Sequence, residues 1–341
     1  MSKDESEKLK LYKYAGGDLG LLYRYFYNPV ACWLVEWVPR WVAPNVLTFL
    51  GWMCTVVPCV YLFGWEGSDF SSPTPPWFSY MSGVCYLVYR VLDEMDGKQA
   101  RRTGNSSPLG LLFDHGCDAF TCGLQCLMYA KCAMVGEGPI VLVAVLLAQL
   151  PFYFATLEEF YTGALYLPIG NGITDGSLFL IALSFLIGAL GSQPFTTQLS
   201  LFGLSVQASH LGFYLLCCSQ IPFCLKNLHE ILQAFFTPIN TDEHYREPVN
   251  FLALFHQISS YLGITVVYFV FAKHSGADLT TNAPLLLSLQ FSWIQVHQAM
   301  NVMLAHMTRS QFNPFNRLYI FHIFSITAIL AAHHLFDVPQ H

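Results

Sequence analysis

Long apolar stretches recur along the whole chain, and they constrain its fold more than any other feature. A helix needs about 20 mostly apolar residues to cross a bilayer, and windows near that length can be drawn at 46–64, 78–96, 110–130, 138–162, 177–191, 204–225, 249–272, 283–307 and 315–336. Only 11% of the residues are charged, against about 25% in soluble domains. Because helices satisfy their own backbone groups in lipid, we predict an all-α, polytopic transmembrane helix bundle of about nine or ten spans.

The residues before the first window differ from the rest of the chain. Residues 1–45 mix aromatic side chains with sparse charges, which is typical of a helix that lies at the membrane surface. We therefore divide the chain into a cytosolic, interfacial segment at 1–45 and one transmembrane domain at 46–341. The start lacks the charged region, short apolar core and cleavage site of a signal peptide, so we expect the first span to target the protein.

Lysine and arginine are placed unevenly between the two sides of the predicted membrane. Those of the N-terminal segment and the cluster between Arg90 and Arg102 fall on one side, and among all others only Lys131 and Lys273 fall opposite. Basic residues gather on the cytosolic side of a membrane. We predict that the N-terminus and the loop after the second span are cytosolic, and we expect lipid surroundings and no nucleic-acid partner.

Four aspartates stand where the second and third windows meet. Asp93 and Asp96 are three residues apart, and each lies on the same face of a helix. Asp114 and Asp118 are four apart and also share a face. A turn between the pairs predicts a catalytic hairpin within 78–130 that brings all four to the cytosolic end. A carboxylate costs about 2.5–3.5 kcal/mol at the bilayer centre, so clustered carboxylates require neutralising cations.

Carboxylate oxygens favour hard divalent ions, so we predict Mg²⁺ or Mn²⁺ as the cofactor. Two ions would balance the four charges and could clamp the attacking and leaving oxygens of a phosphoryl displacement. Gly97 and Gly110 would let a phosphate or nucleotide approach the backbone closely. Arg101 could bind phosphate oxygens with both arms of its guanidinium.

Two other interpretations of the acids are open. They could form salt bridges with Lys98, Arg101 and Arg102, or they could mark the ion pathway of a transporter. The acids gather on one hairpin at one membrane face, however, and no paired interrupted helices indicate an inverted repeat. The placement therefore favours an enzyme.

The hairpin residues complete a longer pattern, DxxDGxxARx8Gx3Dx3D, with every position filled from Asp93 to Asp118. This pattern resembles that of the CDP-alcohol phosphotransferase family. The runs DGKQARRT, SSPLG and FDHGCD resemble its eukaryotic choline/ethanolamine phosphotransferase branch in particular. WVAPNVLT at 41–48 and LAHMTRS at 304–310 resemble segments of the same branch, so the likeness extends over most of the chain.

The resemblance implies an enzyme that transfers phosphocholine or phosphoethanolamine from CDP-choline or CDP-ethanolamine to the hydroxyl of diacylglycerol or alkyl-acylglycerol, releasing CMP. The residues that it implies as metal ligands are Asp93, Asp96, Asp114 and Asp118. Those that it implies as contacts to the CDP portion are Asn45, Gly97, Arg101 and Gly110. Glu158, near the end of the fourth span, is a candidate for attracting the cationic head group, and an ordinary interfacial helix end explains it equally well.

Two residues are candidates for the general base. The resemblance points to His115, or to Asp118 as in more distant relatives, and we favour His115 because histidine ionises near neutrality. The chain departs from the branch at Leu111, where the branch usually has an acid. It also has fewer apolar windows than the ten spans of that branch.

The resemblance leaves the exact substrates open. An acceptor such as inositol or glycerol phosphate is the runner-up, although an anionic acceptor would need basic residues beyond Arg101 and Arg102. The choice between choline and ethanolamine is not decided by these residues. We expect a multi-pass protein of the endoplasmic reticulum, or of the Golgi, with its active site facing the cytosol and a homodimer as one arrangement to test.

Overall fold

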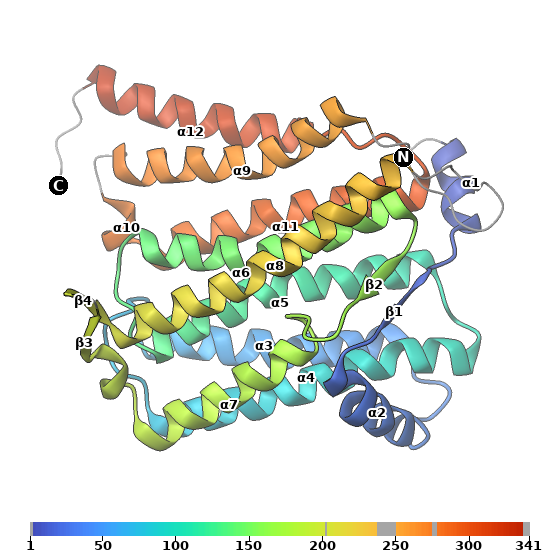
Figure 1. Cartoon of the computed structure of the whole chain (residues 1–341), viewed down its shortest axis with the longest axis horizontal. Helices are drawn as coiled ribbons and strands as arrows, with labels where there is room; N and C mark the ends of the chain where they lie inside the picture. Colours follow the sequence, from blue (N-terminus) through green and yellow to red (C-terminus); the bar gives the residue numbers. More distant parts are fainter. Residues whose placement is uncertain (1–2, 202, 237–249, 275–277, 337–341) are drawn as a thin grey trace.

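The computed structural model describes residues 3–201, 203–236, 250–274 and 278–336. Every apolar window falls on one long helix of this part of the chain (Figure 1). These helices are α3 (Pro44–Trp65), α4 (Pro76–Thr103), α5 (Pro108–Cys132), α6 (Pro139–Thr162), α7 (Asp175–Leu190), α8 (Ala208–Phe236), α9 (Phe251–His274), α11 (Pro284–Thr308) and α12 (Arg317–Phe336). Shorter helical elements are α1 (Lys3–Leu11), a π-helical turn (Tyr23–Tyr27), α2 (Asn28–Val35), a 3₁₀ turn (Gln193–Thr196) and α10 (Leu279–Asn282). The predicted helical bundle is confirmed.

Proline and glycine set the ends of several long helices. The helices α3, α4, α5, α6 and α11 each begin at a proline, whose missing N–H is not needed in the first helical turn. Gly104 follows α4 with a φ of 70°, and its N–H donates to the carbonyl oxygens of Ala100 and Arg101. Glycine tolerates this left-handed conformation, so α4 stops sharply and the chain returns directly into α5.

The long helices lie side by side, with their ends gathered at two opposite ends of the bundle (Figure 1). Helix α5 is central and packs against α3, α6 and α11, while α4 packs against α3 and α7. Helices α9 and α12 pack on each other at one edge. A Cβ at Gly123 would lie 2.2 Å from Ser292 Oγ, so glycine permits the close contact between α5 and α11. Small residues commonly allow such contacts between membrane helices.

Four of these helices are long and apolar enough to cross a membrane, namely α3, α6, α8 and α9. Helix α7 and residues 317–331 of α12 are apolar but shorter. Helices α4 and α5 have the length but carry the charged hairpin. The chain is therefore a membrane protein by these four helices, and the total of nine or ten spans stays a prediction.

The N-terminal segment folds onto one end of the bundle. Its turn at Tyr23–Tyr27 and helix α2 are followed by Trp37 and Trp41, which are 74% and 84% exposed, as is common for aromatic side chains at a membrane interface. Earlier in the segment, β1 (Gly16–Asp18) pairs in parallel with β2 (Leu165–Leu167), which follows α6. A Cβ at Gly16 would lie 2.3 Å from the Leu165 carbonyl oxygen. This pairing adds a tie to the helical fold that we had not predicted.

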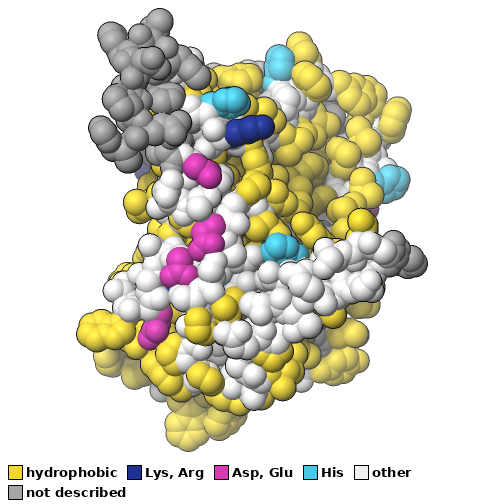
Figure 2. Space-filling model, turned by 90° about the vertical axis from the view of Figure 1, so that its left-hand side faces the viewer, with side chains coloured by type: hydrophobic (Ala, Val, Ile, Leu, Met, Phe, Trp, Pro, Cys, Tyr) yellow, Lys and Arg dark blue, Asp and Glu magenta, His cyan; other side chains and the backbone are white. Residues whose placement is uncertain are grey.

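The two ends of the bundle differ in charge. The basic residues of α4 lie at the end where α3 begins, and the opposite end is seen in Figure 2. That end carries the hairpin of β3 (Gln198–Leu201) and β4 (Leu204–Gln207) (Figure 1). Acidic side chains gather on this face (Figure 2). Its loops hold Glu66, Asp69, Glu137 and Asp278, and the buried Lys131 donates to Asp69 at 3.2 Å. The basic residues that the structure describes lie at the ends of the bundle expected from their predicted sides of the membrane. Arg246 lies outside the described residues.

Candidate functional site

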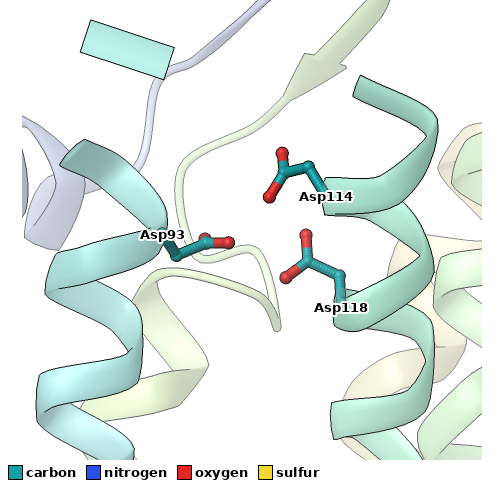
Figure 3. Close-up of side chains that lie close together, drawn as sticks. All are labelled: Asp93, Asp114 and Asp118. Carbon is teal, nitrogen blue, oxygen red and sulfur yellow. The ribbon is translucent and has the colours of Figure 1, made fainter. Parts of the chain in front are cut away.

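The α4–α5 hairpin brings together three of the four predicted aspartates. Ser107 caps α5, because its hydroxyl accepts the N–H of Gly110 at 3.0 Å and so satisfies a free donor of the first turn. One carboxylate oxygen of each of Asp93, Asp114 and Asp118 lies within 4.8 Å of the others (Figure 3). The side chains converge from the two facing helices, as the helical spacing predicts.

These three carboxylates suit a divalent cation. Two oxygens on opposite sides of Mg²⁺ are about 4.2 Å apart, given metal–oxygen distances of about 2.1 Å. Small side-chain movements would therefore close the cluster on one ion. Asp114 Oδ1 is buried and has no hydrogen-bond partner among the described residues. An unpaired buried acceptor is costly, and a bound cation would satisfy it.

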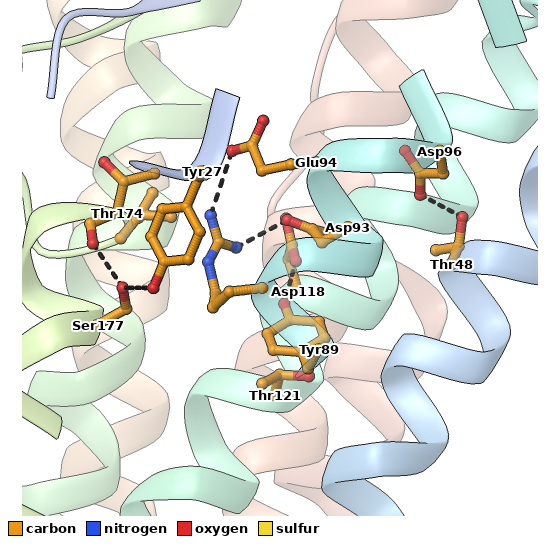
Figure 4. A network of polar contacts seen from close by, with 12 residues as sticks. Tyr27, Thr48, Tyr89, Asp93, Glu94, Asp96, Asp118, Thr121, Thr174 and Ser177 are labelled. Atoms are coloured by element: carbon orange, nitrogen blue, oxygen red, sulfur yellow. Dashed lines mark hydrogen bonds and ion pairs between the residues drawn. The ribbon is translucent and has the colours of Figure 1, made fainter. Parts of the chain in front are cut away.

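Asp96 lies almost one helical turn beyond Asp93 and outside that group of three, but its carboxyl group contacts that of Asp114. Its carboxylate accepts a hydrogen bond from Thr48 of α3, which fixes its orientation (Figure 4). It lines a polar pocket together with Asp114. A second ion, held with the help of Asp96, stays a prediction.

Arg90 forms an ion pair with the cluster, although its position in the sequence predicts only a side of the membrane. It is 3% exposed. Its Nη1 donates to Asp93 Oδ2 at 2.7 Å, and its Nη2 lies 3.6 Å from Glu94 Oε1. The rings of Tyr27 and Tyr89 flank the guanidinium at 5.8 and 5.7 Å. The spacing of three residues between Arg90 and Asp93 is the signal that could have revealed this ion pair.

The basic residues that we considered as salt-bridge partners lie elsewhere. Within the described ranges, Lys98 pairs with Glu94 at 3.7 Å and Arg102 pairs with Glu36 at 3.3 Å. Arg101 lines the polar pocket. Of the four aspartates, only Asp93 forms an ion pair within the described residues, and its partner is Arg90.

The polar pocket lies at the basic end of the hairpin and has a volume of about 400 Å³. All four residues implied as contacts to the CDP portion line it: Asn45, Gly97, Arg101 and Gly110. A Cβ at Gly110 would lie 3.2 Å from Asn45 Oδ1, so a side chain there would narrow the pocket. The structure therefore brings these residues together beside Asp96 and Asp114.

The N-terminal segment supplies a wall of this pocket that we had not predicted. Tyr12, Lys13 and Tyr14 line it, and Tyr12 donates its hydroxyl hydrogen to Glu159 Oε1 at 3.1 Å. Burial, and then the nearby Glu159 carboxylate, raise the pKa of Tyr12 far above its ordinary value. Tyr12 is therefore a stable O–H donor that ties the segment to α6.

His115 lies on α5, between the polar pocket and an apolar cavity. Its ring meets the rings of Tyr14 and Phe152 edge-on, each with centroids 6.3 Å away. Tyr14 belongs to the wall of the polar pocket, and Phe152 belongs to the wall of an apolar cavity. Asp118, the other candidate base, lines that cavity, and its carboxylate accepts the Tyr89 hydroxyl.

Glu158 lies apart from both environments. It is 4% exposed, and its two oxygens accept from Lys226 Nζ of α8 at 2.7 and 3.0 Å. It lines neither the polar pocket nor the apolar cavity. A role for Glu158 at the substrate head group would have to compete with this ion pair, which joins α6 to α8.

The apolar cavity extends from the aspartates between α4, α5, α6, α7 and α8, with a volume of about 240 Å³. Asp118 and Arg90 are at its polar end, and side chains such as Phe179, Leu183 and Phe213 form its walls. Helix α7 packs on α4 and α8 packs on α6, whereas α7 and α8 make little contact with each other in the described residues. The cavity thus lies beside the boundary between α7 and α8, where a lipid could enter from the side.

Comparisons with known protein sequences show the family of this chain. A sequence model of the family described as CDP-alcohol phosphatidyltransferase matches residues 41–206, which hold α3 to α7 and both pairs of aspartates. An uncharacterised CDP-alcohol phosphatidyltransferase class-I family protein 3 of Dictyostelium discoideum is 31% identical, over 92% of this chain and 82% of that protein. The chain belongs to the CDP-alcohol phosphatidyltransferase family. The resemblance inferred from the aspartate pattern is confirmed.

Named relatives of this CDP-alcohol phosphatidyltransferase family member point to one branch. Choline/ethanolaminephosphotransferase 1 of Arabidopsis thaliana is 37% identical over 56% of the chain and 48% of that protein. Choline/ethanolaminephosphotransferase 1 of Saccharomyces cerevisiae is 29% identical over 91% of the chain and 79% of that protein. The chain thus spans about half of the length of the Arabidopsis relative and most of the yeast one.

Proposed function

We propose that this protein transfers phosphocholine or phosphoethanolamine from the CDP-alcohol to the hydroxyl of diacylglycerol or alkyl-acylglycerol, producing the phospholipid and CMP. The observation that carries the proposal is the meeting of two pockets of opposite character at one cluster of carboxylates. Asp114 lines the polar pocket, Asp118 lines the apolar cavity, and both belong to the group of three. A water-soluble nucleotide and a lipid could therefore reach the same ions from two sides.

The polar pocket suits the CDP portion of the donor. Arg101 offers a planar guanidinium for phosphate oxygens, and Lys13 adds a second positive charge at the wall. Gly97 and Gly110 leave the backbone open to close approach. The names of the plant and yeast relatives support choline or ethanolamine as the alcohol.

The apolar cavity suits the acyl chains of the acceptor. A lipid whose chains lie between α7 and α8 would have its polar end at Asp118 and Arg90. The mostly apolar walls of the cavity argue against inositol or glycerol phosphate, which are polar acceptors. This placement supports a neutral lipid with one free hydroxyl.

The transfer would form a bond from the acceptor hydroxyl oxygen to the phosphorus that carries the alcohol. The bond from that phosphorus to the phosphate oxygen of CMP would break, and CMP would leave with the electron pair. Mg²⁺ or Mn²⁺ held by Asp93, Asp114 and Asp118, with Asp96 beside them, would neutralise charge on the phosphate oxygens. His115 would accept the hydroxyl proton, with Asp118 as the rival base.

The test is an assay of the purified protein in lipid nanodiscs with CDP-choline and CDP-ethanolamine side by side. We expect CMP release that depends on added diacylglycerol and is matched by new phospholipid. CMP release with inositol or glycerol phosphate instead would assign another acceptor. Passage of solute across vesicles without CMP release would indicate a transporter and would contradict the proposal.

The orientation gives a separate prediction. The basic residues of α4 and the polar pocket lie at the same end of the bundle, so the donor should enter from the cytosol. In sealed vesicles of known orientation, CDP-alcohol supplied only to the cytosolic face should support full turnover. Vesicles permeabilised with detergent give the total activity for comparison. Turnover only from the opposite face would overturn the assigned topology.

The cellular setting is part of the same proposal. We assign the protein to the endoplasmic reticulum, or to the Golgi, as a multi-pass enzyme and a homodimer. Microscopy of the tagged full chain together with markers of both membranes tests the location. Mass measurement of the protein in nanodiscs tests the dimer.

A further inference from the structure

Arg90 occupies the junction between the aspartate cluster and the apolar cavity. It lines the cavity together with Asp118 and is absent from the residues around the polar pocket. It precedes Asp93 by three residues of α4, which is a rise of about 4.5 Å along the helix. A group in the cavity that interacts with Arg90 therefore lies on the same side of the carboxylates as Asp118.

The guanidinium has hydrogen-bonding capacity that the protein does not use. Its Nη1 donates to Asp93 at 2.7 Å, and the 3.6 Å between Nη2 and Glu94 is longer than a hydrogen bond. Its Nε has no partner among the described residues but also almost no accessible surface, so a ligand in the cavity would have to use Nη2. Arginine carries five N–H donors, and a buried donor without an acceptor is costly. The site therefore lacks an acceptor atom that a ligand could supply.

The surroundings hold this donor in place. The rings of Tyr27 and Tyr89 flank the guanidinium (Figure 4). Their hydroxyls are already engaged, that of Tyr27 with Ser177 at 2.6 Å and that of Tyr89 with the Asp118 carboxylate. Neither ring can therefore turn its hydroxyl to the free donor without losing a bond. The cavity, which Arg90 lines, could supply an acceptor for Nη2.

We propose that Arg90 determines acceptor specificity by donating a hydrogen bond to the sn-2 ester carbonyl of the lipid. In a lipid with a free sn-3 hydroxyl, the sn-2 ester is the polar group nearest to that hydroxyl. With the hydroxyl at Asp118, this carbonyl lies on the side of Arg90. The inference rests on the proposed function, since it requires a glycerolipid acceptor in the apolar cavity.

The proposal predicts different effects for loss of the sn-1 and of the sn-2 ester carbonyl. A 1-alkyl-2-acylglycerol keeps the sn-2 carbonyl and should serve as well as diacylglycerol. A 1,2-dialkylglycerol has an ether oxygen there, which is a poor acceptor. We expect its kcat/KM to be lower by about 10–100-fold, the effect of one hydrogen bond to a charged group.

The experiment measures kcat/KM for these three acceptors at one CDP-alcohol concentration. The variants are Arg90→Met, which keeps the length without donors, and Arg90→Lys, which keeps the charge without the guanidinium Nη donors. Both should lower the preference for an sn-2 ester to within about threefold. Glu94→Gln is the matched control, because it removes the 3.6 Å contact and leaves Arg90. It should keep the preference of the wild type.

The preference is a ratio within one preparation, so a lower yield or a slower variant does not alter it. A wild type that turns over all three acceptors equally would overturn the inference and leave the proposed function standing. The same holds for an Arg90→Met variant that retains the preference. Loss of all turnover in both Arg90 variants would also overturn it, because Arg90 would then serve only to hold Asp93. A wild type inactive with every glycerolipid would instead refute the proposed function.

Discussion

Replacing Asp114 by Ala is expected to lower turnover by at least about 10³-fold, a loss of about 4 kcal/mol of transition-state stabilisation. The reason is that Asp114 borders both the group of three carboxylates and the polar pocket, where it would hold a cation against the donor phosphates. The protein should still insert and fold, because Asp114 forms no ion pair within the described residues and its removal relieves repulsion among the clustered carboxylates. Turnover is measured with saturating Mg²⁺, and thermal stability is measured on the same sample.

Asp93→Ala should cause the same loss of turnover with a different effect on stability. This variant leaves the buried Arg90 without its 2.7 Å partner, and removing one partner of a buried pair is strongly destabilising. Its melting temperature should therefore fall below that of Asp114→Ala. Asp278→Ala removes an exposed carboxylate far from the cluster, at the other end of the bundle, and should retain full turnover. Substantial activity of Asp93→Ala or Asp114→Ala at saturating Mg²⁺ would refute the assignment of metal ligands.

Removal of metal tests the same site without a mutation. Treatment with EDTA should abolish turnover, and added Mg²⁺ or Mn²⁺ should restore it. Binding of the metal alone to the wild type and to Asp114→Ala, followed by calorimetry, gives a measurement independent of activity. Turnover that persists in a rigorously metal-free preparation would count against the cofactor.

Replacing His115 by Ala is expected to lower kcat by about 10²–10⁴-fold, the usual contribution of general acid–base catalysis. The His115 ring lies between a ring of the polar pocket and a ring of the apolar cavity, although His115 itself lines neither, so its side chain would have to turn toward the acceptor hydroxyl. Binding of the CDP-alcohol should change little, because His115 does not line the polar pocket. Single-turnover rates and equilibrium binding of CDP-choline measure the two effects separately.

A second substitution separates proton transfer from packing. His115→Phe keeps a ring between Tyr14 and Phe152 but cannot accept a proton, so its kcat should fall as far as that of His115→Ala. Recovery of turnover in His115→Phe would mean that the ring only supports its neighbours. Near-normal turnover in both variants would assign the base to Asp118 instead, which lines the cavity directly.

The helices could be predicted from the sequence because their signals are local. Apolar windows of nearly membrane-spanning length located every long helix of the described chain. Prolines at 44, 76, 108, 139 and 284 and Gly104 then set several ends to within a few residues. The sheet between β1 and β2 could not be predicted in this way, since the residues that it pairs are far apart in the sequence and only three residues long on each side. Such pairing depends on the position of α6 in the folded bundle.

The sequence by itself determined the membrane character, the family and the convergence of Asp93, Asp114 and Asp118, because helical spacing and one tight turn fix a hairpin. Only the tertiary structure decided what surrounds these carboxylates. It set Arg90 against Asp93, placed Thr48 on Asp96, and brought the N-terminal segment to the polar pocket. It also formed the cavity from five helices spread between residues 76 and 236. Contacts between distant segments depend on how whole helices pack, and no local pattern of residue types carries that information.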